Sequence, residues 1–239
     1  MKLKKQKPLP LIKLLKQNLL LSLTGFIFFI SSCSHHEKVK NIFHYNEQSG
    51  IATLDPAFAK NQSINWAVHQ LYNTLVQTDN NMNLIPSLAK SWDESDDNLT
   101  FTFHLRNDVF FQDNDAFPNG KGRKMTAADV VYSFQRILDK NTASSGAWIF
   151  NGRVDTIEPF KAINDTTFQL KLLKPFHPIL GVMSMQYCSI VPKEAVEKYG
   201  KDFRRHPCGT GPFELVAWEE DQAMVMKKKS KLFRKRQCR

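Results

Sequence analysis

Three short segments carry the residue types of a catalytic or phosphate-binding site. Arg106 and Asp108 stand close together and could look catalytic, but they follow a run of alternating apolar residues, so we expect them to flank a strand. Residues 209–212 (Gly-Thr-Gly-Pro) lack the following lysine and helix start of a phosphate-binding loop, and the basic loop at residues 120–124 lacks its spacing. No segment has the spacing of a nucleophile elbow, a zinc-binding HExxH or paired CxxC motifs. The sequence therefore predicts no catalytic residue, no metal site, no cofactor and no enzyme activity.

Cys33 is a candidate site of covalent modification. It follows an apolar stretch at residues 19–30, which is preceded by six lysines and no acidic residue. The 12 residues of this stretch are too few to span a bilayer, and Ser31 and Ser32 supply the small residues of a cleavage site. The pattern resembles a bacterial lipoprotein box, so we expect residues 1–32 to be a signal peptide and the Cys33 thiol to carry lipid. An ordinary signal peptide with an incidental cysteine is the alternative.

Two of the remaining cysteines form a candidate disulfide. Cys188 and Cys208 each lie next to an expected strand end or turn. A bridge between them would close a loop of about 20 residues and stabilise the fold by about 3 kcal/mol, which suits an exported protein. Two buried free thiols are the alternative, and both stay open at this point.

The charge of the chain is concentrated at its two ends. The 239 residues carry a formal net charge of +10, which alone would suggest nucleic acid as a partner. The six lysines of residues 1–32 and the eight Lys and Arg of residues 227–239 have no acidic neighbours, so residues 33–226 carry a net charge of −4. The body is mildly acidic, and no nucleic-acid-binding surface is expected.

The basic tail at residues 227–239 has no hydrophobic periodicity, and we interpret it as out of frame. One permitted set of codons begins with a run of adenines. Removing a single adenine changes the translation to Lys-Lys-Asn-Pro-Asn-Tyr-Phe-Glu-Lys-Asp-Asn-Ala, which is balanced in charge and contains a turn signal. We therefore expect a frameshift near Lys227 that truncates a longer protein. A genuine polybasic tail is the alternative.

Between these ends, short strands and helices alternate without a regular βαβ pattern, which predicts an α+β (irregular α/β) fold. Helical spacing begins near Ile64 with Asn61 or Ser63 as its cap, and Thr126 with Asp129 resembles a capping box. The expected strands are residues 41–45, 100–105, 109–111 (a neighbour of the preceding one), 166–172, 213–218 and 223–227, and a short helix is expected at residues 193–199, closed by Gly200.

Five segments together resemble one protein family. They are residues 54–56 (LDP), 86–92 (PSLAKSW), 99–109 (LTFTFHLRNDV), 126–134 (TAADVVYSF) and 207–213 (PCGTGPF). Their order and spacing resemble the solute-binding proteins of family 5, the oligopeptide- and dipeptide-binding lipoproteins of bacterial ABC importers. The resemblance runs from about Phe43 to Met226.

The resemblance implies a two-lobed periplasmic binding protein of which this chain supplies the N-terminal portion. We expect the start of lobe I at residues 33–69, an extra subdomain at residues 70–170 and a return to lobe I at residues 171–226, with the second lobe missing. Peptides would lie extended between the lobes and bind through backbone hydrogen bonds. A permease in the inner membrane would be the protein partner, and lipid on Cys33 would hold the chain at a membrane of the periplasm or cell envelope.

The resemblance also places ligand contacts. One stretch falls on Lys60, Asn61, Gln62 and Ser63, and a second falls on Gly146 and Trp148. Each has an alternative: the first leads into a helix and caps it, and Trp148 packs against the core. We expect this chain itself to be an inactive fragment with half a cleft and poor solubility. The alternatives are the same fold binding nickel, haem or an oligosaccharide, or a stand-alone lipoprotein scaffold.

Overall fold

The computed structural model describes residues 42–229, of which residues 42–46 belong to one unit and residues 47–229 to a second, compact unit. Cys33, the expected signal peptide, Cys238 and most of the basic tail lie outside the described residues. The expected first strand is wrong for its described part, residues 42–45, which have no regular secondary structure. A strand exists only through pairing, and the strand ladders of the described residues do not include this segment.

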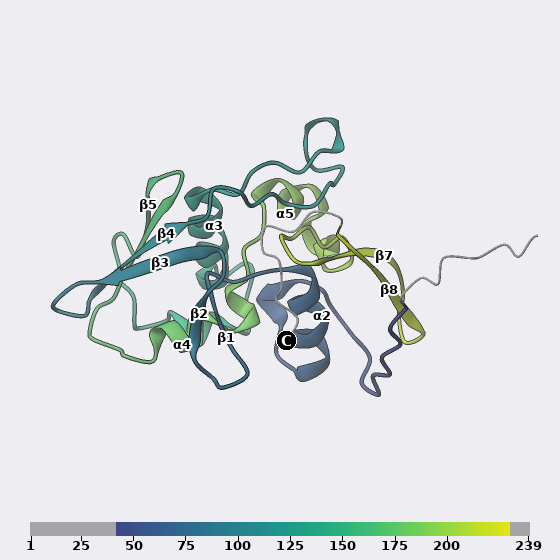
Figure 1. The fold of residues 1–239 in the computed structure, drawn as a ribbon, viewed down its shortest axis with the longest axis horizontal. Helices are drawn as coiled ribbons and strands as arrows, with labels where there is room; N and C mark the ends of the chain where they lie inside the picture. The colour runs from purple at the N-terminus through teal and green to yellow at the C-terminus, as the bar shows by residue number, and fades with distance from the viewer. Residues whose placement is uncertain (1–41, 230–239) are drawn as a thin grey trace, which may run out of the picture. The chain divides into compact units, whose positions relative to one another are not determined.

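The helices and strands of residues 42–229 all lie in the second unit (Figure 1). The α-helices are α2 (Gln62–Leu71), α3 (Ala127–Leu138), α4 (Ile179–Met183) and α5 (Lys193–Tyr199), and the 3-10 helices are η1 (Pro56–Phe58), η2 (Pro118–Gly120), η3 (Ala147–Ile149), η4 (Gln186–Cys188) and η5 (Gly200–Arg205). The strands are β1 (Val76–Thr78), β2 (Leu84–Pro86), β3 (Ala89–Glu94), β4 (Thr100–Leu105), β5 (Phe160–Asn164), β6 (Thr167–Lys171), β7 (Phe213–Glu219) and β8 (Ala223–Lys228). Within residues 42–229, no helix is long and apolar enough to cross a membrane.

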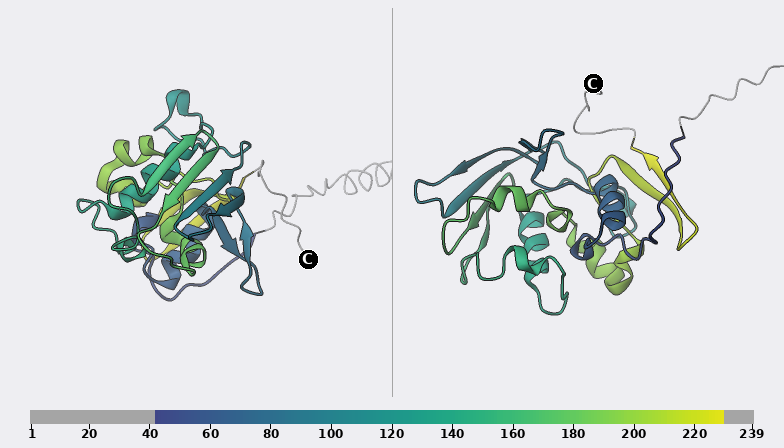
Figure 2. Two further views of the ribbon diagram at one scale, coloured as in Figure 1. Left: turned by 90° about the vertical axis from the view of Figure 1, so that its left-hand side faces the viewer. Right: turned by 90° about the horizontal axis from the view of Figure 1, so that it is seen from below.

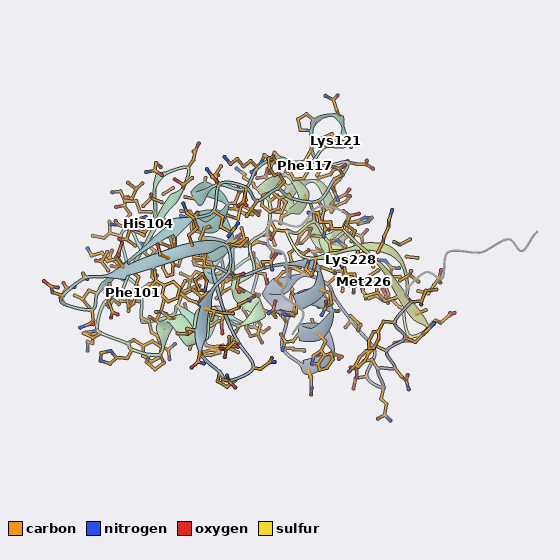
Figure 3. All side chains as sticks on the ribbon, in the orientation of Figure 1. Phe101, His104, Phe117, Lys121, Met226 and Lys228 are labelled. Carbon is orange, nitrogen blue, oxygen red and sulfur yellow. The ribbon has the colours of Figure 1, made fainter. Side chains whose placement is uncertain are left out.

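The largest sheet is antiparallel, with the strand order β3-β4-β6-β5. As expected, Phe101, Phe103 and Leu105 of β4 are buried, whereas the side chain of His104 on the opposite face is 43% exposed (Figure 3). The buried face packs against α3, whose Phe134 ring lies 5.1–5.5 Å from the rings of Phe150, Phe160 and Phe168. This cluster fixes the loop that precedes β5, because Phe150 is fully buried in it.

Local signals in the sequence explain several element boundaries. Asn61 caps α2 through a 3.0 Å hydrogen bond from the Ile64 N–H, and the Thr126–Asp129 capping box begins α3. Gly200 ends α5 with a positive φ of 52°, which glycine adopts without strain. Strands β7 and β8 form an antiparallel pair beside α2 (Figure 2, right).

One expectation about the connecting segments needs correction, and one connecting loop is held by distant contacts. Residues 109–111 do not form a strand beside β4; Phe110 makes an isolated bridge to Lys124 instead. The basic loop at residues 120–124 is held in place, because the Arg123 guanidinium donates to the carboxylates of Asp129 and Glu194 at 2.6–2.9 Å. The pairing depends on residues up to 71 positions away, which no local pattern indicates.

The fold class is as expected, mixed α+β with antiparallel sheets. All four strands of the large sheet fall between Ala89 and Lys171. The boundaries of the expected parts at residues 69, 170 and 226 stay predictions.

Candidate functional site

A buried ion pair fixes the segment before α2. The Arg136 guanidinium at the end of α3 donates to both carboxylate oxygens of Asp55, at 2.8 and 2.6 Å, and the side chains are 12% and 5% exposed. Asp55 also accepts from the Ala57 N–H at 3.0 Å and so begins η1. Burial lowers the pKa of Arg136, but the hydrogen bonds and charge of Asp55 outweigh it and raise that pKa overall. The segment that leads to Lys60 is therefore anchored to α3.

Contacts around η4 link the segments that flank the two expected contact stretches. The Ser144 hydroxyl donates to the Ala57 carbonyl at 2.6 Å and accepts from the Gly146 N–H at 3.0 Å. Gly146 lies flat on the Tyr187 ring, since a Cβ at this position would approach that ring to 2.6 Å. The 3-10 helix η4, which contains Tyr187, also contacts η1 and α2. One hydrogen bond thus joins Ser144 to Ala57, which precedes the first stretch, and one close packing contact joins Gly146 of the second stretch to η4.

The first stretch presents mainly polar groups. Lys60, Asn61 and Gln62 are exposed, and Ser63 is buried with its hydroxyl 3.1 Å from the Asn61 side-chain oxygen. Asn61 therefore performs the capping role of the alternative interpretation. The first turn of an α-helix leaves N–H groups without intrahelical acceptors, and Asn61 satisfies only that of Ile64. Among the described residues, the N–H groups of Gln62 and Ser63 have no acceptor.

The second stretch presents an aromatic side chain. Ile149 and Phe150 are fully buried, which anchors η3, while the preceding Trp148 is 46% exposed. The Arg153 guanidinium lies 5.9 Å from the Trp148 ring and donates to the Trp148 carbonyl. Trp148 therefore lies at the surface, and Arg153 contacts both its ring and its carbonyl.

Neither of the two cavities of about 540 and 390 Å³ is lined by the six expected contact residues. The larger cavity borders Asp55, Arg136 and α5, and the smaller follows the outer edge of β7. Of the six expected contact residues, Ser63 and Gly146 are buried, and the other four are exposed. Within residues 42–229, no group of three or more His, Cys, Asp or Glu could hold a metal ion.

Cys188 and Cys208 are free and buried in the structure, in agreement with the alternative of two free thiols rather than with a bridge. Burial raises the pKa of both thiols, that of Cys208 to about 12. The Cys208 thiol donates to the Gln112 carbonyl at 3.6 Å, and Cys188 is part of η4. Packing, rather than a covalent link, holds the two segments.

The glycine-rich turn and the Arg106–Asp108 pair have structural roles. A Cβ on Gly209 or Gly211 would lie 2.1–2.3 Å from backbone atoms of Leu71, so only glycine permits this approach to the end of α2. Arg106 and Asp108 form a partly exposed ion pair at 2.7–2.9 Å just after β4. Neither feature faces the candidate site through a described contact.

Sequence analysis missed the residues that assemble the site. Arg136, Ser144 and Tyr187 each join segments far apart in the chain, and Asp55 and Arg136 are 81 positions apart. One weak signal was available: glycine is typical of positions where another group packs closely, and Gly146 is such a position.

The described fold is that of bacterial periplasmic binding proteins. The chain is similar to the solved structure of the DppA periplasmic binding protein of Helicobacter pylori in complex with the peptide STSA, with a TM-score of 0.68 and 29% identity over 77% of this chain and 38% of that one. The likeness covers helices and strands from most of the described residues.

Sequence comparison identifies the family. Residues 83–236 match the bacterial extracellular solute-binding proteins, family 5 Middle, and the chain belongs to this family. The match continues beyond Met226, where the resemblance was expected to stop. The chain is 35% identical to the dipeptide-binding protein of Escherichia coli K12 over 170 residues, which cover 66% of this chain and 31% of the relative. It is 31% identical to the probable ABC transporter periplasmic-binding protein SapA of the same organism over 206 residues, which cover 80% and 37%. The chain therefore spans about a third of the length of these relatives.

Proposed function

We propose that this chain is part of the substrate-binding component of a peptide ABC importer and contacts extended peptides through Lys60, Asn61, Gln62, Ser63, Gly146 and Trp148. The observation that carries the proposal is the junction of the two stretches through Ser144, Ala57 and Tyr187. Relatives named for dipeptide binding, and a similar structure in complex with a peptide, support the choice of ligand.

The available groups suit a ligand that is recognised through its backbone. The N–H groups at the start of α2 donate to peptide carbonyls, and the half-exposed Trp148 ring packs on side chains of many kinds. Backbone pairing supplies affinity without demanding one sequence. This is the chemistry expected of a peptide importer rather than of an enzyme.

The location and partners follow from the same proposal. A lipid on Cys33 anchors the protein at a membrane of the periplasm or cell envelope, and a permease in the inner membrane receives the peptide. The related periplasmic binding proteins support this location.

We further infer that this chain alone binds weakly. The chain spans about a third of the length of its relatives, and affinity falls steeply when anchoring contacts on the opposite side of a site are absent. A soluble monomeric preparation with micromolar affinity for peptides would contradict this inference.

Nuclear magnetic resonance with the full chain tests the function, because it detects weak binding. Titration with di- to tetrapeptides should shift the amide signals of residues 60–63 and 146–148 and leave those of β7 and β8 unchanged. Absence of any shift, or shifts confined to β7 and β8, would contradict peptide binding at this surface. A stronger response to haem or a nickel complex would point to the alternative ligands of this fold.

A further inference from the structure

Four arginines of the described residues lie over aromatic rings, and one of them differs from the rest. Arg123 pairs with Asp129 and Glu194, Arg136 with Asp55, and Arg205 with Glu220. Arg153 lies 4.8 Å from the Phe176 ring and 5.9 Å from the Trp148 ring, yet no carboxylate of residues 42–229 pairs with it.

The contacts of Arg153 fix its position and leave donors unused. One terminal nitrogen, Nη1, donates to the carbonyls of Trp148 and Ile149. The Arg153 carbonyl accepts from the Leu173 N–H at 2.8 Å, which fixes the backbone. A guanidinium carries five N–H donors in a planar fork, so Nε and Nη2 still present theirs. Within the described part of the chain, no acceptor for these two nitrogens exists.

The surrounding sequence lacks negative charge. Residues 140–154 and 166–193 contain no Asp or Glu, although residues 33–226 as a whole carry a net charge of −4. Lys174 and His177 add basic groups on the exposed loop that holds Phe176. The nearest acid along the chain, Asp155, accepts from two backbone N–H groups and pairs with Lys171 at 3.3 Å.

A half-buried arginine near two rings, without a carboxylate of its own, is suited to a carboxylate from outside. The hydrogen bonds of Nη1 fix the guanidinium, and the two nitrogens without an acceptor form the bidentate geometry that carboxylates match. Trp148 is part of the proposed peptide surface, so this guanidinium borders it directly.

We propose that Arg153 binds a carboxylate of the ligand, the C-terminus of a short peptide, beside Trp148. This inference rests on the proposed function, because it names the group of the peptide that meets this part of the surface. It makes Arg153 a specificity residue that distinguishes peptides with a free carboxylate from those without one.

The test compares tri-alanine with tri-alanine amide, which lacks the carboxylate, by nuclear magnetic resonance titration of the full chain. The free acid should bind about tenfold more tightly and shift the Arg153 Nε–H and Trp148 indole N–H signals, as expected for a charge-assisted hydrogen-bond pair. In Arg153→Gln the preference should vanish while the affinity for the amide stays unchanged. Arg153→Lys should keep only part of the preference for the free acid, because lysine keeps the charge but not the planar fork of donors.

Arg205→Gln is the matched control, since Arg205 also lies over a tryptophan, at 5.2 Å from the Trp218 ring, but pairs with Glu220. This variant should keep the preference for the free acid. Equal affinity of the unaltered chain for acid and amide would overturn the inference and leave peptide binding standing. Binding of neither peptide would overturn both. Loss of the preference in Arg205→Gln as well would show a general charge effect and would also overturn the role of Arg153.

Discussion

Arg136 and Arg153 lie in two regions with similar aromatic surroundings, but only Arg136 pairs with a carboxylate of the described residues. Both guanidinium groups lie over aromatic rings, that of Arg136 at 5.6 Å from Phe203 and that of Arg153 at 4.8 Å from Phe176. We call the region around Arg136 closed, because Asp55 pairs with its guanidinium inside the fold. We call the region around Arg153 open, because no carboxylate of residues 42–229 pairs with that guanidinium. The nearby ring is common to both arginines, so the carboxylate partner decides their roles. An arginine with such a partner stabilises the fold, and one without it is available to a ligand.

The closed region should show the largest loss of stability. Asp55→Ala removes the partner of a buried guanidinium and the cap of η1 together. We expect it to lower the free energy of unfolding by about 3–5 kcal/mol, measured by denaturant titration, because an unpaired buried charge is costly. Asp108→Ala breaks the more exposed pair with Arg106 and should cost less than about 1 kcal/mol. Equal effects would remove the distinction between closed and surface pairs.

Gly146 packs closely against Tyr187 of η4. Gly146→Ala places a methyl group 2.6 Å from the Tyr187 ring, so we expect a loss of about 1–3 kcal/mol by the same titration. Gly181→Ala is the control, because nothing lies within 4 Å of a Cβ there. In helix α4 that change should be neutral or stabilising. Equal losses in both variants would show that Gly146 does not pack as described.

Arg123 and Glu194 also form an ion pair within the fold, but both side chains are partly exposed. Hydrogen bonds from Arg123 lower the pKa of Glu194 against the opposing effect of burial. A carboxyl with a lowered pKa stabilises the fold above its ordinary pKa of about 4.3, and this contribution disappears as the pH falls through the lowered value. Glu194→Gln should therefore lower stability at pH 7 by less than about 1 kcal/mol, and the difference should narrow below about pH 4. A difference that widens in acid would contradict this sign.

The open region should contribute least to stability. Arg153→Gln removes no ion pair, so we expect a change within about 0.5 kcal/mol in the free energy of unfolding. A loss comparable to that of Asp55→Ala would mean that Arg153 is a structural residue.

The parts of the fold with local signals were predictable from the sequence. The alternation in β4, the Thr126–Asp129 capping box and Gly200 at the end of α5 each depend on neighbours a few residues away. The strand expected near Phe43 was wrong because strand formation depends on a distant pairing partner. The residue pattern shows that a segment can pair but not what it pairs with.

The candidate site was predictable only as two separate stretches. Their junction depends on Ser144 donating to Ala57, 87 positions away, and on Gly146 packing against Tyr187. The free state of Cys188 and Cys208 was one of two open alternatives, because spacing along the chain does not fix the distance between thiols. Likewise, an arginine without a carboxylate partner is visible only when the surrounding chain is in place.

Photo-crosslinking with a short peptide tests the central claim most directly, namely that the surface joined by Ser144 and Tyr187 contacts the ligand. A tripeptide carrying a benzophenone side chain is irradiated with the full chain, and the modified residues are located by mass spectrometry. We predict crosslinks at residues 60–63 and 146–148, reduced by excess unlabelled tripeptide. Crosslinks confined to β7 and β8, or labelling that excess peptide does not reduce, would contradict the account.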